Sequence, residues 1–133
     1  MELNEIQNGV LKCLGESLAK SVSDIAVTAT LIADLGVDSL DILDISFSLE
    51  KEFKIKLRGS ALDELLKMDF KTDVNGFLNL SDIKRFAAWM PALAKNNSQN
   101  IKPVELFNFI TVESLALLIQ QQLKMHKDQH NGI

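Results

Sequence analysis

A serine beside an acid lies where the chain's patterning predicts the start of a helix. Ser39 follows Asp38 and precedes Leu40, and Gly36 interrupts the pattern just before them. A helix start has unpaired backbone N–H groups and a partial positive charge, so it stabilises a phosphate attached to a nearby hydroxyl. These residue types suit a serine that receives a phosphate-linked group. The alternative is a serine that only caps the helix.

A helix from Ser39 to about Phe53 is expected to position this hydroxyl. Its apolar residues recur at helical spacing, in one stripe and a second group beside it. The stripe is Leu40, Leu43 and Phe47, and the second group is Ile42, Ile45 and Leu49. The serine would therefore stand at the end of a rigid, amphipathic element.

Two further helices are predicted from apolar spacing. The first runs to about Lys20, and residues 21 to 38 follow as a long loop. The last helix begins after Thr111, a suitable N-cap. Its apolar stripe is Val112, Leu115, Ile119 and Leu123. A polar and flexible tail is expected at about residues 125–133.

The middle of the chain, about residues 58–107, predicts shorter elements. Ser60 is placed to cap a short helix, and Asn75-Gly76 marks a tight turn. Ser81 is expected to cap another helix, with Pro91 near its end. Residues 95–100 are polar and predict a mobile loop. The chain is therefore expected to be all-α.

Composition narrows the class of protein. The 133 residues, with a mass of 14.8 kDa, suit one domain, and the net charge of -4 argues against nucleic acid as a partner. Cys13 is the only cysteine, so a disulfide within the chain is impossible. No apolar run approaches membrane-spanning length, and the N-terminus lacks the pattern of a signal peptide. A cytoplasmic protein is expected.

The segment around Ser39 resembles the prosthetic-group site of acyl carrier proteins. The resemblance begins with Leu35-Gly36-Val37-Asp38-Ser39-Leu40-Asp41 and continues through residues 42–45 and 49–57. Residues 109–115 resemble the start of the family's last helix. Together the likeness covers about residues 1–57 and 105–124. It implies a four-helix bundle with a helical insertion, about 58–107, between the second and last helices.

The resemblance implies that Ser39 carries 4′-phosphopantetheine, attached covalently from coenzyme A, and that Asp38 supports the attachment. The working group is then the thiol at the end of the arm, so no residue of the chain need be a catalyst and no metal is expected. The acyl chain is expected to be sheltered by Leu43, Phe47 and Ile42. Ordinary core packing is the alternative explanation for these three side chains.

Acidic residues on the second helix are the expected docking surface for partners. Asp41 and Asp44 are neighbours on one helix face, and Glu50 lies further along. The resemblance implies a phosphopantetheinyl transferase, acyl-chain synthases and acyltransferases as partners, each with a basic patch. Clustered charge mainly raises the rate of encounter. A solvated helix face is the alternative, and a monomer is expected.

The function predicted is a specialised acyl carrier in fatty acid or lipid biosynthesis, extending to very long chains for lipid A. The aromatic residues of the insertion suggest an enlarged acyl pocket or a docking surface specific to one partner. Two alternatives stay open: a carrier for polyketides or other secondary metabolites, and an unmodified interaction protein with the same bundle.

Other candidate sites are weaker. Asp73-Val74-Asn75-Gly76 has part of the spacing of a calcium loop, but Lys71 stands where the first acidic ligand is needed. His126 and His130 could share a helix face, yet no further ligand is near them in sequence, so they are interpreted as surface residues. Cys13 lies on an apolar stripe and is interpreted as a buried side chain.

Overall fold

The computed structural model describes residues 1–96 and 100–131, and only the backbone of 126–131. The elements in chain order are α1 (Leu3–Leu18), η1 (Val22–Asp24), α2 (Ser39–Phe53), α3 (Ala61–Lys67), α4 (Leu80–Ala87), α5 (Pro91–Ala94), η2 (Pro103–Phe109) and α6 (Val112–Asn131), where η marks a 3₁₀ helix. Within the described ranges, β pairing is limited to two isolated bridges. The all-α prediction is confirmed.

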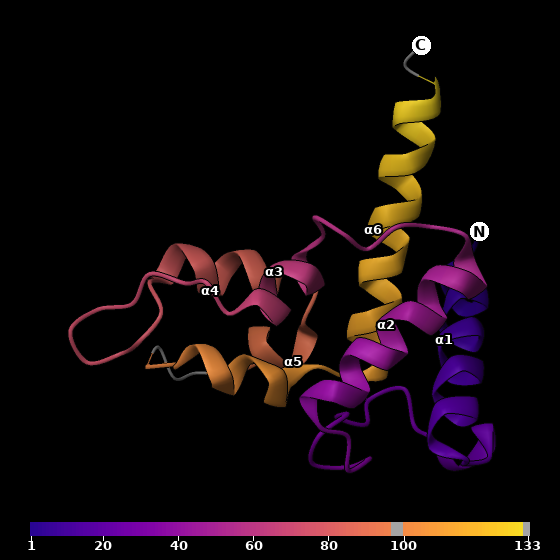
Figure 1. The fold of residues 1–133 in the computed structure, drawn as a ribbon, viewed down its shortest axis with the longest axis horizontal. Helices are drawn as coiled ribbons and strands as arrows, with labels where there is room; N and C mark the ends of the chain where they lie inside the picture. The colour runs from indigo at the N-terminus through magenta and orange to yellow at the C-terminus, as the bar shows by residue number, and fades with distance from the viewer. Residues whose placement is uncertain (97–99, 132–133) are drawn as a thin grey trace.

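A bundle of α1, α2 and α6 forms the part of the fold that holds Ser39 (Figure 1). Helix α1 packs against both of the others, and its Ile6, Val10 and Leu14 are fully buried. The long loop before α2 is fastened to the start of α6, because Leu31 N donates to Ile110 O at 2.9 Å. Burial of these apolar faces is the main stabilising contribution.

Helix α2 buries only one of its two predicted apolar groups. Ile42, Ile45 and Leu49 are buried against the bundle. The other group, the stripe of Leu40, Leu43 and Phe47, is open instead, and these side chains are 74%, 40% and 59% exposed. The sequence pattern alone does not separate the two groups, because both have helical spacing.

The short helices are capped by side chains, with one correction. Ser60 caps α3 as predicted, since its Oγ accepts from Asp63 N at 3.3 Å. The N-cap of α4 is Asn79, whose Oδ1 accepts from Asp82 N at 2.8 Å, so the prediction that Ser81 caps this helix is wrong. Asn79 starts the helix two residues earlier, and an asparagine oxygen serves as well as a serine oxygen.

The end of α4 also differs from the prediction. The helix stops at Ala87, and Pro91 begins α5 rather than ending α4. Proline suits the first position of a helix because its missing N–H would have no helical partner there.

A second group of helices, α3, α4 and α5, lies beside the bundle, and a loop between α3 and α4 projects from it (Figure 1). Arg85 of α4 forms ion pairs with Glu64 of α3 and with Asp82. The ring of Phe86 makes edge-on contacts with Phe70 and Trp89, at centroid distances of 5.5 and 6.3 Å. Phe86 and Trp89 belong to the same continuous core as the buried residues of the bundle, and Phe70 packs against it.

Helix α6 continues well past the bundle to Asn131 (Figure 1). The expected flexibility of the tail stays a prediction. The side chains of His126 and His130 lie outside the described part of the chain, as do residues 97–99 of the predicted mobile loop. No helix among the described residues is long and apolar enough to cross a bilayer.

Candidate functional site

Ser39 is the first residue of α2, and its side chain is exposed. The N-cap is Asp38, whose Oδ1 accepts from Asp41 N at 2.8 Å, while Asp41 Oδ2 accepts from Asp38 N at 3.0 Å. This reciprocal pair satisfies two backbone donors of the helix start. Ser39 is therefore not the capping residue.

The loop that leads into Ser39 is held by its own hydrogen bonds. Thr30 N donates to Asp34 Oδ2 at 2.8 Å, and Val37 N donates to Leu31 O at 2.9 Å. Gly36 has a φ of 71°, a left-handed conformation that costs glycine little. Val37 is buried, so the chain is anchored two residues before the serine. A group attached to Ser39 would start from a defined position.

The predicted docking acids fall into two environments. Asp41 and Asp44 are exposed on the turns of α2 next to Ser39. Glu50 is half-buried, and its Oε2 accepts from Leu57 N at 2.7 Å, so this carboxylate holds the segment after the helix. The geometry groups Asp41 and Asp44 with the serine and places Glu50 apart from them. The docking role of all three stays a prediction.

A pocket of about 790 Å³ opens between α2 and α3, here called the α2–α3 pocket. It is lined by Leu43, Ser46, Phe47, Glu50, Lys56, Leu57, Arg58, Leu62, Asp63, Leu66 and Lys67. Two of the three predicted acyl-contacting residues, Leu43 and Phe47, are therefore brought together at its wall. The third, Ile42, is 1% exposed and belongs to the bundle core.

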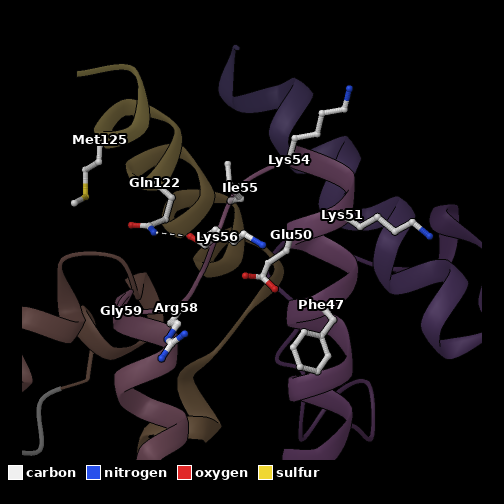
Figure 2. Close-up of a pocket in the computed structure, with 10 residues that line it drawn as sticks. All are labelled: Phe47, Glu50, Lys51, Lys54, Ile55, Lys56, Arg58, Gly59, Gln122 and Met125. Atoms are coloured by element: carbon white, nitrogen blue, oxygen red, sulfur yellow. Dashed lines mark hydrogen bonds between the residues drawn. The ribbon is translucent and has the colours of Figure 1, made fainter. Parts of the chain in front are cut away.

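A second pocket, also of about 790 Å³, lies between the end of α2, the segment after it and α6, and is here called the linker pocket (Figure 2). It is lined by Phe47, Glu50, Lys51, Lys54, Ile55, Lys56, Arg58, Gly59, Gln122 and Met125. Gln122 Nε2 donates to Lys56 O at 3.1 Å and joins α6 to the segment.

The cations of the linker pocket were missed in the sequence. Lys54, Lys56 and Arg58 alternate with Ile55 and Leu57, both buried. Alternation of this kind puts the charged side chains together on the outer side of an extended segment. That alternation is the signal that would have found the cationic cluster.

Cys13 is 4% exposed, and its Sγ lies 3.7 Å from Ser48 O of α2. Burial, followed by the nearby charges of Glu52 and Glu16, raises the pKa of this thiol to about 11. At neutral pH the thiol is protonated and a poor nucleophile. Among the described residues, no group of three or more His, Cys, Asp or Glu side chains is placed to hold a metal ion.

Comparisons with known proteins match the half of the chain that contains Ser39. Residues 8–67 match the family described as "Phosphopantetheine attachment site". Among the curated proteins, an "Acyl carrier protein" of Rickettsia bellii (strain RML369-C) is 28% identical over 67 residues, which are 50% of this chain and 78% of that protein. No solved structure matches the chain. The matched region runs through α3, past the residue at which the insertion was expected to begin.

Proposed function

We propose that the chain is a specialised acyl carrier and that Ser39 is its attachment residue. The premise is the match of residues 8–67 to the phosphopantetheine attachment site family and the similarity to an acyl carrier protein. The prosthetic group of such a domain is a covalently bound 4′-phosphopantetheine. The observation that carries the proposal is an exposed hydroxyl at the first residue of α2, with Asp38 serving as the cap.

The geometry suits each requirement of a carrier. The start of α2 stabilises the phosphodiester by about 0.3–1 kcal/mol, the usual contribution of a helix end to an exposed anion. The arm supplies a thiol on which acyl groups are held as thioesters. Asp38 fixes the helix start, and the anchored loop sets the direction in which the arm leaves. Leu43 and Phe47 offer apolar surface to an acyl chain at the α2–α3 pocket.

Partners are proposed to approach the acidic side of this site. A phosphopantetheinyl transferase, acyl-chain synthases and acyltransferases would align basic patches with Asp41 and Asp44. The exposed Leu40 lies between these acids and Ser39 and would add an apolar contact to the same surface. The chain itself then supplies no catalyst, and the chemistry is performed by its partners in the cytoplasm.

The pathway proposed is fatty acid or lipid biosynthesis, extending to very long chains such as those of lipid A. The support is the packed middle segment beside α2, which can lengthen the shelter for a chain. We propose that it belongs to a single carrier domain spanning residues 1–133. A carrier for polyketides or other secondary metabolites would use the same attachment chemistry.

The test is enzymatic loading of the apo protein. Coenzyme A, magnesium and a transferase of broad specificity should add one phosphopantetheinyl group, measured as intact mass. Ser39→Ala should abolish the addition, and Ser48→Ala, on the same helix, should leave it unchanged. No addition under conditions that load a control carrier would overturn the proposal and favour an unmodified interaction protein.

A further inference from the structure

The two pockets beside α2 share part of their walls and so form one continuous groove. Phe47, Glu50, Lys56 and Arg58 line both of them. The groove begins near Leu43 of α2, passes the exposed ring of Phe47, and ends between Lys54 and α6 (Figure 2). A single elongated ligand can therefore occupy both pockets.

The character of the groove changes along its length. The α2–α3 pocket has an apolar wall formed by Leu43, Leu57, Leu62 and Leu66. In the linker pocket, the cations Lys51, Lys54, Lys56 and Arg58 line the space with Glu50 as the single carboxylate. A ligand with an apolar body and an anionic end matches this change, because its anion would form charge-assisted hydrogen bonds with the exposed cations.

The cations are available, whereas the carboxylates near them are engaged. Among the described residues, Lys56 and Arg58 form no ion pair within 4.0 Å. Glu50 is bound to Leu57 N, as described above. Asp63 accepts from Gly59 N at 2.8 Å and pairs with Lys67 at 3.3 Å. Arg58 is attracted by the nearby charge of Asp63 but forms no ion pair with it, so an incoming anion would compete only with that longer-range attraction.

The orientation of the side chains distinguishes two of the four cations. In Figure 2, Glu50, Phe47 and Arg58 border the same hollow, while Lys51 and Lys54 are directed away from it. Lys56 and Arg58 are also the two cations that line both pockets. They are the residues best placed to meet an anionic end.

Ser39 is within reach of the groove. At the rise of an α-helix, Phe47 lies about 12 Å along the axis from Ser39 and Glu50 about 16 Å. A phosphopantetheine arm laid along α2 spans a comparable length. The thioester would then lie near Phe47, with the attached acyl group directed toward Lys56 and Arg58.

We propose that this groove selects acyl groups whose far end carries a carboxylate, with Lys56 and Arg58 binding that end. The inference rests on the proposed attachment at Ser39 and deepens it by naming a substrate class. An arginine and a lysine at the rim suit a carboxylate, because hydrogen bonds between charged groups are stronger than neutral ones. Hydrocarbon contacts along Leu43 and Leu57 would hold the chain between its two ends.

The test compares matched acyl groups on the intact chain. Apo protein is loaded from the coenzyme A thioesters of butyrate, hexanoate and octanoate, and from those of succinate, adipate and suberate. At one length or more, the carboxylate-ended group should raise Tm above its methyl-ended counterpart by about 2–4 °C. In NMR spectra, the backbone amide signals of Leu57, Arg58 and Gly59 should differ between the carboxylate-ended and methyl-ended forms.

Variants test whether Lys56 and Arg58 cause the difference in Tm between the two series. Arg58→Gln and Lys56→Gln should each reduce the difference in Tm by half or more, and high salt should do the same. Lys20→Gln is the matched control, since it removes one exposed positive charge that lines neither pocket, and the difference should persist. Circular dichroism confirms that each variant is folded.

The outcomes separate this inference from the proposed function. If Ser39 is loaded but the two series give equal Tm values and equal amide signals at every length, the carboxylate site does not exist. An equal loss in Lys20→Gln would show a general charge effect and would also overturn the inference. If Ser39 accepts no group at all, the proposed function fails and the inference fails with it.

Discussion

The two ends of α2 differ in the charged residues around them and in the burial of their carboxylates. At its N-terminal end, Asp38, Asp41 and Asp44 surround an exposed Ser39. At its C-terminal end, Lys51 and Lys54 precede a segment with two more cations, and Glu50 is turned inward to hold that segment. One helix thus has exposed acids around a serine at one end and a hollow lined by cations at the other.

Helix electrostatics favours this arrangement at both ends. Acids stabilise the N-terminus of a helix and cations stabilise the C-terminus, by about 0.3–1 kcal/mol each at exposed positions. The same charges that support α2 therefore divide its surface into two regions. The carboxylates at both ends take part in the structure. Asp38 and Asp41 stay exposed while they cap α2, whereas Glu50 is half-buried and holds Leu57 N.

The largest expected effect is on partner kinetics at the acidic end. Asp41→Asn with Asp44→Lys removes the charge at 41 while keeping an oxygen for the helix cap. Transferase loading should slow about tenfold or more at low ionic strength, because steering by charge raises the rate of encounter. The loss should shrink at high salt, as measured by initial rates.

The control for this effect changes the net charge equally elsewhere. Asp69→Asn with Asp24→Lys alters two exposed acids outside α2, and loading should stay near the wild-type rate. If both pairs slow loading alike, the acidic end has no special role in docking.

At the basic end, Glu50→Ala should lower the free energy of unfolding by about 1–2 kcal/mol. The variant leaves Leu57 N without its acceptor in a partly buried position. Glu50→Gln keeps an acceptor oxygen and should recover most of the loss in urea unfolding. Loading rates should be unchanged in both variants. Slow loading in Glu50→Gln would instead show that the charge of Glu50 contributes to partner docking.

Asp38→Ala should cost about 1 kcal/mol of stability, the usual cost of losing an N-cap. Asp38→Asn retains an accepting oxygen and should unfold close to the wild type. Ser39→Ala should change the unfolding free energy by less than about 0.5 kcal/mol, because its hydroxyl does not cap α2. A loss of 1 kcal/mol in Ser39→Ala would mean that the serine supports the helix after all.

A last effect, confined to alkaline pH, lies between the two ends, where Cys13 contacts α2. The folded pKa of this thiol is raised from 9.0 to about 11, so the unfolded chain ionises first as pH rises. The contribution to stability is present below pH 9 and is lost between pH 9 and 11. Unfolding curves of wild type and Cys13→Ala should diverge in that window. Parallel pH profiles would contradict the shift.

Local chemistry made much of the site predictable. The extent of α2, the Ser60 cap and the turn at Asn75-Gly76 follow from residue types within a few positions of one another, and the structure has all three. The prediction that Ser81 caps α4 was wrong for a related reason. Asn79 offers an equally good oxygen two residues earlier, and choosing between them requires the packing of the whole helix.

By itself, the sequence determined the helical class, a hydroxyl at the start of an acidic helix, and the elements on either side of it. These depend on spacing and capping, which act over a turn or two. Only the tertiary structure decided which apolar stripe of α2 is buried. It also decided that Leu43 and Phe47 line the pocket while Ile42 lies in the core, and that the Glu50 carboxylate binds Leu57 N. Those outcomes depend on how α3, α6 and the segment after α2 pack against α2. The spacing of apolar residues within α2 does not indicate which elements pack against each side.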